Sequence, residues 1–463
     1  MIEGLQPYSE YKESNIPWAQ VLPSNWHTER AKRLFTKMQR PVRPEDEVVT
    51  CFRDGRVTLR KNRRLRGFTE ATAFSGYQGI RVGDLVIHGM DAFAGAIGVS
   101  DSDGKGTPVY NVCKPKPGIV AGYYAHTVRE MSRAQWILAL AKGIRERSTD
   151  FRYETFGNQF VPLPPPDEQA AIVRFLEHAN RKIDGFIRAK RKLIGLLNEQ
   201  KQAIIHRAVT RGLDPHAPLK LSGIPWLGDI PQHWEVKRAK QVCSRIVDCK
   251  NRTPDMIDSG EFTVVRTTNI RNGVFNLRGS YPTDRRNFNI WTERGAPRLG
   301  DVFFTREAPV GEACIVPDRQ DLCMGQRMMY FRPDTEVLDA EFLLHSIYGP
   351  VVRTYLEHAV NGSTVGHLRL GQVGAIPMLW CPVAEQKEIV AHINQEFAPL
   401  DTAIARTERE IALMQEYRTR LTADVVTGKL DVRPAAAKLP EDSFSESLPE
   451  ETLDDAEPEE TEA

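Results

Sequence analysis

Apolar residues recur at alternating steps of four and three along two stretches of the sequence. The first stretch follows Leu163-Pro164-Pro165-Pro166, where Asp167 can cap a helix and Glu168 and Gln169 fall in its first turn. This spacing predicts two long helices with coiled-coil seams. The expected seam residues are Ile172, Leu176, Ile183, Leu193 and Leu197 on the first helix, and Ile389, Ile393, Leu400, Ile404, Ile411 and Met414 on the second.

Each seam extends over about 40 residues, which corresponds to a helix roughly 60 Å long. The first register is interrupted at Lys190 and Gln200, and Pro399 is expected to kink the second helix. One such helix alone would expose its apolar stripe to water, so we expect the two stripes to cover each other. An antiparallel pair would place the domains that precede the helices at opposite ends, related by a pseudo-twofold axis.

A different pattern precedes each seam, with short apolar runs separated by Gly, Pro and Asp. Asp84-Leu85-Val86-Ile87 and Asp301-Val302-Phe303-Phe304 have the length and composition of strands. Helical patterns occur near residues 130–145 and 339–358. These features predict a mixed α/β globular domain that occurs twice.

The chain contains an internal repeat. Motifs that recur 208 positions later include Ile16-Pro17-Trp18 with Ile224-Pro225-Trp226, and motifs that recur 217 positions later include Gly83-Asp84 with Gly300-Asp301 and Glu168-Gln169 with Glu385-Gln386. The change of offset places a net insertion of nine residues between Lys240 and Gly300. Fixed offsets of this kind indicate that one ancestral unit was duplicated.

Together these patterns predict an α+β chain with two similar α/β domains, separated by a pair of long helices that form an antiparallel coiled coil. The repeated Pro/Trp segments and the Gly-Asp pairs are expected to be structural, the latter opening a strand after a turn. The expected boundaries are 1–162 for the first domain, 163–212 for the first long helix, 213–376 for the second domain, 377–433 for the second long helix and 434–463 for a disordered acidic tail.

Charge is unevenly distributed along the chain, although the formal net charge is only +1. From Leu439 onward there are 11 acidic residues and no basic ones, so the preceding residues carry a net charge of +12. A basic body fits a nucleic-acid partner, but many solvated surfaces are equally basic. The tail has the composition of a disordered segment, acting as an inert solubiliser or as an electrostatic competitor of DNA.

The seven cysteines form no CxxC pair, and the histidines show no metal-binding spacing. Free thiols in a reducing cytoplasm are the simplest interpretation. No apolar run approaches the length that spans a bilayer, and the N-terminus lacks the apolar stretch of a signal peptide. The sequence therefore predicts a cytoplasmic protein with no metal site and no membrane partner.

The chain resembles the DNA-specificity subunit of type I restriction–modification systems. The features that carry the resemblance are the duplicated plan, the Gly-Asp segments, the Pro-rich segments that lead into Glu168-Gln169 and Glu385-Gln386, and the long helices. The resemblance covers residues 1 to about 433. It implies two target-recognition domains, each reading one half of a bipartite sequence in double-stranded DNA, in a system of phage defence. It also implies that the helices set the spacing and dock two methyltransferase subunits, and that a restriction/translocase subunit completes the complex.

The resemblance further implies a chain without catalysis or cofactors of its own, with S-adenosylmethionine, ATP and Mg²⁺ held by the partner subunits. The motifs agree, since the Asn/Asp-Pro-Pro-Tyr/Phe loop of amino-methyltransferases does not occur. Gly104-Lys105 lacks the first glycine and the Ser/Thr of a phosphate loop and is interpreted as a turn. Two other interpretations remain open: an enzyme with its own active site, and a coiled-coil scaffold that binds only protein.

Candidate DNA contacts are basic and hydrogen-bonding residues inside the two domains, because phosphates attract cations and base edges bind Arg, Asn and Gln. In the first domain they are Arg53, Arg56, Arg60, Lys61, Arg63, Arg64, Arg66, Tyr77, Gln78, Arg145 and Arg147. In the second domain they are Arg266, Thr268, Asn269, Arg271, Arg278, Arg285, Arg286, Gln326, Arg327, Asn361, Ser363, His367 and Arg369. Asn272-Gly273 in the second group predicts a hairpin turn. Each cluster could instead be a solvated loop away from DNA.

Overall fold

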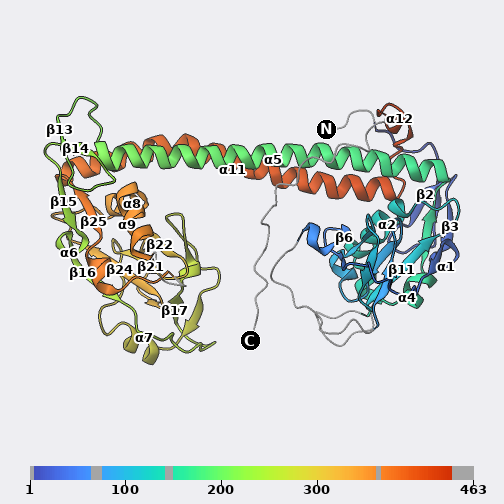
Figure 1. Ribbon diagram of the computed structural model, residues 1–463, viewed down its shortest axis with the longest axis horizontal. Coiled ribbons are helices and arrows are strands. Elements are labelled where there is room, and N and C mark those ends of the chain that lie inside the picture. The colour runs from blue at the N-terminus through green and yellow to red at the C-terminus, as the bar shows by residue number, and fades with distance from the viewer. Residues whose placement is uncertain (1–4, 64–75, 141–149, 361–365, 441–463) are drawn as a thin grey trace. The chain divides into compact units, whose positions relative to one another are not determined.

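The computed structural model describes residues 5–63, 76–140, 150–360 and 366–440, and the chain divides into two compact units (Figure 1). The first unit comprises Met1–Ala189 and Glu410–Ala463, and the second comprises Lys190–Arg409. Each long helix contributes one part to each unit.

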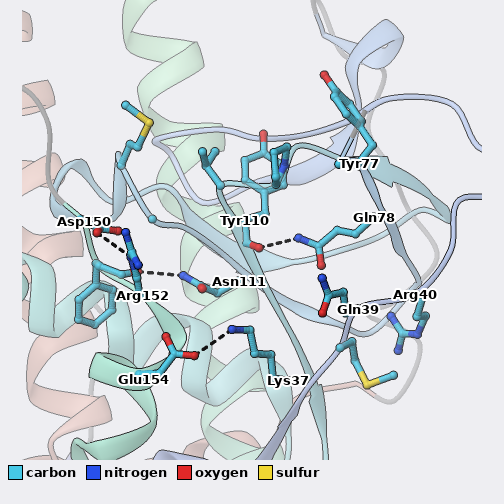
Figure 2. A pocket seen from close by; sticks show the side chains of 17 residues that line it. Lys37, Gln39, Arg40, Tyr77, Gln78, Tyr110, Asn111, Asp150, Arg152 and Glu154 are labelled. Carbon is cyan, nitrogen blue, oxygen red and sulfur yellow. Dashed lines mark hydrogen bonds and ion pairs between the residues drawn. The ribbon is translucent and has the colours of Figure 1, made fainter. Parts of the chain in front are cut away.

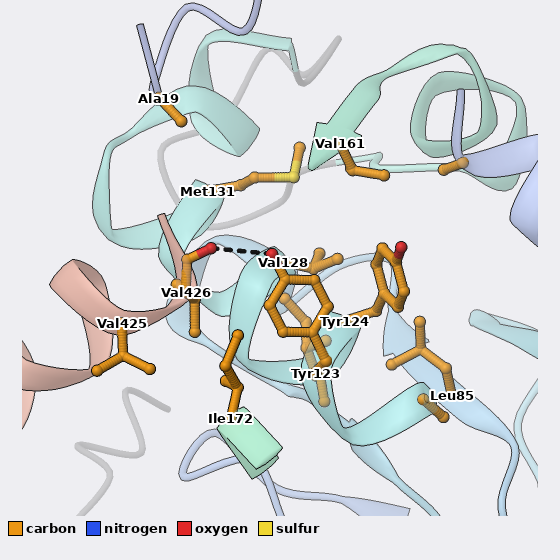
Figure 3. Close-up of a cluster of buried hydrophobic side chains, with 14 of the residues drawn as sticks. Ala19, Leu85, Tyr123, Tyr124, Val128, Met131, Val161, Ile172, Val425 and Val426 are labelled. Carbon is orange, nitrogen blue, oxygen red and sulfur yellow. Dashed lines mark hydrogen bonds between the residues drawn. The ribbon is translucent and has the colours of Figure 1, made fainter. Parts of the chain in front are cut away.

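The first unit is built on an antiparallel four-stranded sheet with the order β4-β11-β8-β9. Its strands are β4 (Phe35–Lys37), β8 (Leu85–His88), β9 (Ile97–Val99) and β11 (Tyr110–Pro115). Helix α2 (Ala121–Arg133) packs on this sheet through Tyr123, Tyr124 and Val128, which share one buried cluster with Leu85 (Figure 3). The apolar run that the sequence placed at residues 84–87 therefore forms a core strand.

Shorter elements surround this sheet. They are β1 (Tyr11–Glu13), β2 (Val21–Pro23), β3 (His27–Arg30), α1 (Ala31–Leu34), β5 (Val49–Cys51), β6 (Val57–Leu59), η1 (Arg60–Asn62), β7 (Gln78–Ile80), η2 (Ala92–Ala94), β10 (Gly104–Gly106), α3 (Trp136–Leu140), α4 (Tyr153–Asn158), β12 (Phe160–Leu163) and α12 (Arg433–Ala436). Antiparallel pairs form between β1 and β2, β3 and β12, β5 and β6, and β7 and β10.

The second unit contains a four-stranded sheet of the same design, with the order β16-β24-β21-β22. Its strands are β16 (Cys243–Asp248), β21 (Val302–Arg306), β22 (Val310–Ile315) and β24 (Met328–Pro333). It adds a three-stranded sheet in the order β20 (Tyr281–Thr283), β17 (Phe262–Val265) and β23 (Leu322–Met324), in which β17 and β23 run parallel. Because β17 begins at Phe262 and β20 ends at Thr283, two of these strands lie where the sequence places the net insertion.

The remaining elements of the second unit lie around these sheets. They are β13 (Leu219–Leu221), β14 (Asp229–Pro231), β15 (Glu235–Arg238), α6 (Ala239–Val242), β17 (Phe262–Val265), η3 (Thr267–Asn269), β18 (Ile270–Arg271), β19 (Val274–Phe275), β20 (Tyr281–Thr283), α7 (Arg285–Trp291), β23 (Leu322–Met324), α8 (Ala340–Tyr348), α9 (Pro350–Val360), α10 (Leu370–Gly374) and β25 (Pro377–Trp380). Strand β15 pairs with β25, just as β3 pairs with β12 in the first unit.

Identical residues of the two copies make the same contacts. Trp26 Nε1 donates a hydrogen bond of 2.8 Å to Glu168 Oε1, and Trp234 Nε1 donates one of 2.9 Å to Glu385 Oε1. Both indoles are fully buried. The Glu residues of the first helical turns therefore anchor the repeated Trp segments, which confirms the structural role expected for those segments.

The Gly-Asp pairs are also structural. Gly83 and Gly300 both have φ +85°, with no atom close to the position of a Cβ, so the left-handed backbone alone favours glycine there. Strands β8 and β21 begin two residues later, and the buried carboxylates of Asp84 and Asp301 pair with Arg40 and Arg332. The expected turn followed by a strand is confirmed in both copies.

The long helices are α5 (Pro166–Arg211) and α11 (Val383–Val426) (Figure 1). At 1.5 Å per residue they are about 69 and 66 Å long, and α11 continues through Pro399. In the first unit, Ile172 shares a buried cluster with Val425, and Asp184 pairs with Arg418, so the helices run antiparallel.

In the second unit the two helices are again antiparallel. Ile205 and Ile393 share one buried cluster, and Lys201 Nζ lies 2.6 Å from Asp401 Oδ1. Helices α5 and α11 therefore pack together in both units, as the matching apolar stripes predicted.

The seam residues differ in burial. Ile172, Leu176, Ile183, Ile389 and Ile393 are buried, and Leu197, Leu400, Ile404, Ile411 and Met414 are half-buried. Leu193 is 39% exposed, whereas its neighbour Ile194 is half-buried. The covered stripe continues through Ile187, Lys190, Ile194, Leu197 and Lys201, so Leu193 does not belong to the seam. Lysine stems can cover apolar surface while their charge stays in water, and the register is therefore not interrupted at Lys190.

This register makes a direct prediction about stability. Ile183→Ala, at a side chain that is 3% exposed, is expected to lower the free energy of unfolding by about 2–4 kcal/mol. Leu193→Ala, at the exposed position, is expected to change it by less than about 0.5 kcal/mol. Urea denaturation followed by circular dichroism measures both values, and equal losses would contradict the seam through Ile194.

Candidate functional site

The basic cluster of the first unit lies on the hairpin of β5 and β6 and on η1. Three of its cations are paired: Arg53 with Asp91 at 3.2 Å, Lys61 with Glu47 at 2.5 Å and Arg63 with Asp54 at 2.7 Å. The fold brings Asp91 and Glu47 to this cluster, which contains only Asp54 in sequence. The backbone N–H of Arg56 donates to Asp54 Oδ1, and Arg60 Nε donates to Thr50 Oγ1. The cluster is thus less positive than its sequence indicates. Arg64 and Arg66 lie outside the described residues.

Tyr77 and Gln78 line a pocket of 490 Å³ at one end of the first four-stranded sheet (Figure 2). Gln78 is buried, and its Nε2 donates a hydrogen bond of 2.7 Å to the carbonyl oxygen of Tyr110. Burial raises the pKa of the Tyr110 phenol to about 12, so it remains neutral at physiological pH. Lys37 and Arg152 also line the pocket, each paired with a carboxylate.

In the second unit, Asn269 is 1% exposed and cannot reach a partner molecule. Its Oδ1 accepts from the backbone N–H of Arg266 at 2.7 Å, and its Nδ2 donates to the carbonyl oxygens of Asn276 and Arg278 at 2.8 and 3.0 Å. Because these three bonds satisfy the buried amide, the expectation that Asn269 reads a base edge is wrong. Asn269 instead holds together the backbone segments that carry Arg266 and Arg278.

Exposed cations surround this buried amide. The side chains of Arg266, Arg271 and Arg278 are exposed, as is that of Thr268, and in the described part of the chain no carboxylate pairs with these three arginines. The Asn272-Gly273 turn joins β18 to β19 with φ of +49° and +84°, which confirms the expected hairpin. This group, Arg266, Arg271 and Arg278, is called the hairpin arginines below.

Two further arginines lie on α7. Arg285 pairs with Glu261 at 2.8 Å and stacks over the ring of Phe262, with its guanidinium carbon 4.8 Å from the ring centre. Arg286 is exposed beside it. Asp284 caps this helix by accepting from the backbone N–H of Asn287.

A third group lies at the end of the second four-stranded sheet. Arg327 Nε and His367 Nδ1 lie 2.8 and 2.6 Å from the two oxygens of the Glu307 carboxylate. Gln326 and Arg369 are exposed, and the backbone N–H of Arg369 donates to Gln372 at the start of α10. Sequence patterns gave no indication of Glu307, because only the fold brings it to Arg327 and His367. Asn361 and Ser363, and Arg145 and Arg147 of the first unit, lie outside the described residues.

The described residues contain no cluster of three or more His, Cys, Asp or Glu side chains that could hold a metal ion. All seven cysteines are buried and unpaired, and burial raises the pKa of the Cys51 thiol to about 12. None of the helices that the structure describes is long and apolar enough to cross a bilayer.

No family model matches the chain, but comparison with known proteins finds related sequences. A protein of Methanocaldococcus jannaschii assigned as the MjaX type I restriction enzyme specificity subunit is 24% identical over 282 residues, which is 59% of this chain and 60% of the relative. The EcoBI specificity subunit of Escherichia coli is 20% identical over 289 residues, which is 60% of this chain and 59% of the relative.

Among solved structures, a chain studied for complex assembly and conformational transition of the type I R-M system is similar over 88% of this chain and 98% of its own length. The TM-score is 0.60 at 16% identity, which establishes a shared fold. The chain is similar in sequence to type I restriction specificity subunits. The chain spans 60% and 59% of the length of the two relatives in the sequence comparisons.

Proposed function

We propose that this chain is a specificity subunit that recognises a bipartite sequence in double-stranded DNA and that it has no catalytic activity of its own. Residues 1–162 and 213–376 would be its two target-recognition domains, each reading one half-site. The duplication carries the proposal, because both units repeat one sheet order and one set of helix anchors. Two copies of one binding module suit a target with two halves.

The long helices would serve as spacer and docking surface. Residues 163–212 and 377–433, which include α5 and α11, would bind two methyltransferase subunits, and a restriction/translocase subunit would complete the assembly. S-adenosylmethionine, ATP and Mg²⁺ would be bound by those partners. The exposed cations of both units would supply affinity through phosphate contacts, which carry no sequence information.

Co-expression with the methyltransferase subunit of the same system tests this proposal. Long-read mapping of methylated adenines should then show a split motif that is methylated on both strands and is lost when this chain is omitted. A stable complex that methylates no motif would contradict DNA recognition and favour a protein scaffold. Binding of S-adenosylmethionine by the isolated chain would contradict the non-catalytic role.

The hairpin arginines make a second prediction about DNA affinity. Arg271→Ala is expected to weaken binding to all sequences alike and to lower the slope of log affinity against log salt by about one, because one phosphate contact is lost. Fluorescence anisotropy with duplexes at several salt concentrations measures the slope. Arg420→Ala, at an exposed residue of α11 that pairs with Glu416, is the matched control. An unchanged slope would mean that the hairpin arginines lie on a solvated loop away from DNA.

A further inference from the structure

The internal repeat allows the two units to be compared position by position. Residues that are identical in both copies, such as Glu168 and Glu385, are anchors of the fold. Residues that occupy equivalent positions but differ in chemistry are candidates for the different sequences that the two units would read. A surface where equivalent positions differ in chemistry is therefore a candidate reading site.

One end of each four-stranded sheet meets this description. In the first unit His88 pairs with Tyr110, and in the second Thr305 pairs with Met328, so the residues that follow, Gly89 and Arg306, are equivalent. Two further bonds support the equivalence. The N–H of Phe151 donates to the carbonyl oxygen of Gly89 at 3.0 Å, and the N–H of Leu368 donates to that of Arg306 at 3.1 Å.

In the first unit this sheet end is hollow. Gly89 lines the pocket of 490 Å³, together with the amide side chains of Gln39, Gln78 and Asn111 (Figure 2). Gln78 and Asn111 are buried and donate to backbone carbonyl oxygens at 2.7 and 2.9 Å. Gln39 is exposed, which makes it the amide at this site that can reach a partner.

In the second unit the position equivalent to Gly89 carries a long, charged side chain. The Arg306 side chain is 9% exposed and pairs with Asp248 at 3.3 Å, so its charge is neutralised inside the protein. The charge that reaches the surface is that of Arg327, whose side chain is 48% exposed. Sequence offers no equivalent of this arginine in the first unit, where Val109 precedes the paired residue Tyr110.

Arg327 is held in a defined orientation. Its backbone has φ +74°, a conformation uncommon outside glycine, and its Nε lies 2.8 Å from Glu307 Oε2. The other carboxylate oxygen of Glu307 lies 2.6 Å from His367 Nδ1. A guanidinium that bonds a carboxylate through Nε still has both η nitrogens to offer. Two parallel N–H groups match O6 and N7 of guanine in the major groove.

We propose that these equivalent sheet ends are the base-reading sites of the two units, with Arg327 reading a guanine in the second half-site and Gln39 reading an adenine in the first. Glu307 is a positioning residue that fixes the Arg327 fork. The assignment of bases follows from chemistry, because arginine pairs with the guanine edge and a glutamine amide pairs with N6 and N7 of adenine. This proposal rests on the proposed function in DNA recognition.

The test is methylation mapping with single variants in the complex with the methyltransferase subunit. Arg327→Ala is expected to relax one guanine position of the second half-site, lowering discrimination there by about tenfold or more, and to leave the first half-site unchanged. Gln39→Ala is expected to relax one adenine position of the first half-site alone. Arg33→Ala, at an exposed residue of α1 that pairs with Glu29, is the control and should retain the complete motif.

Two conservative variants separate recognition from folding. Arg327→Lys keeps the charge but loses the paired η nitrogens, so it is expected to relax the same guanine position even if Arg327→Ala fails to assemble. Glu307→Gln is expected to weaken that preference less than Arg327→Ala does. Retention of the guanine in Arg327→Lys, or relaxation in the wrong half-site, overturns the proposal while the motif of the unaltered chain still supports DNA recognition. Absence of any split motif with the unaltered chain would instead refute the proposed function.

Discussion

Under the proposed function, exchange of residues 27–160 for the corresponding region of a type I specificity subunit is expected to replace one half of the recognised sequence and to leave the other half unchanged. The physical reason is that the two ends of the exchanged segment lie side by side in the fold, on the paired strands β3 and β12. His27 opens β3, and β3 pairs with β12 in the register Arg30 with Phe160 and His27 with Leu163. The anchors Trp26 and Glu168 lie outside the segment, so they would hold any replacement of the same fold.

Methylation mapping measures this result directly. The reciprocal exchange of residues 235–377, which spans the equivalent strands β15 to β25, should change only the other half. Both exchanges keep α5 and α11, so the length of the gap between the half-sites should not change. If either exchange altered both halves, independent reading by the two units would be wrong.

Glu168→Ala is expected to lower the free energy of unfolding by about 3–5 kcal/mol, because it leaves several buried donors without an acceptor. The Glu168 carboxylate is 2% exposed and accepts from Trp26 Nε1 at 2.8 Å, from Asn25 Nδ2 at 3.1 Å and from the Tyr8 hydroxyl. Burial and this carboxylate raise the pKa of Tyr8, so its hydroxyl remains a donor. Arg433 of the C-terminal segment lies 3.9 Å from the same carboxylate.

Urea denaturation of the complete chain, followed by tryptophan fluorescence, measures this loss. Glu385→Ala removes the equivalent anchor of the second unit, where the acceptor side chain is 25% exposed, and should therefore have a smaller effect. Glu168→Gln keeps the length of the side chain and one acceptor oxygen, so it should recover part of the stability. A loss below about 1 kcal/mol in Glu168→Ala would mean that water replaces the carboxylate, which the burial of Trp26 argues against.

The sequence by itself determined the features that depend on local pattern or on the repeat. Heptad spacing located α5 and α11, and the shared offset of Glu168 and Glu385 marked two anchors that the structure shows bonded to Trp26 and Trp234. The turn at Asn272-Gly273 was also readable, because the two-residue type of hairpin requires positive φ at both residues. Duplication made these signals strong, since each was present twice.

Only the tertiary structure decided which polar side chains are available to a partner. The sequence predicts that Asn269 binds a base edge, yet its amide is buried and is hydrogen-bonded to three backbone groups. Lys61 and Arg53 read as unpaired cations, yet the fold brings Glu47 and Asp91 to them. The support of Arg327 by Glu307 was invisible for the same reason: hydrogen bonds and ion pairs form between residues that are distant in sequence, and their partners are set by strand register, which no local pattern encodes.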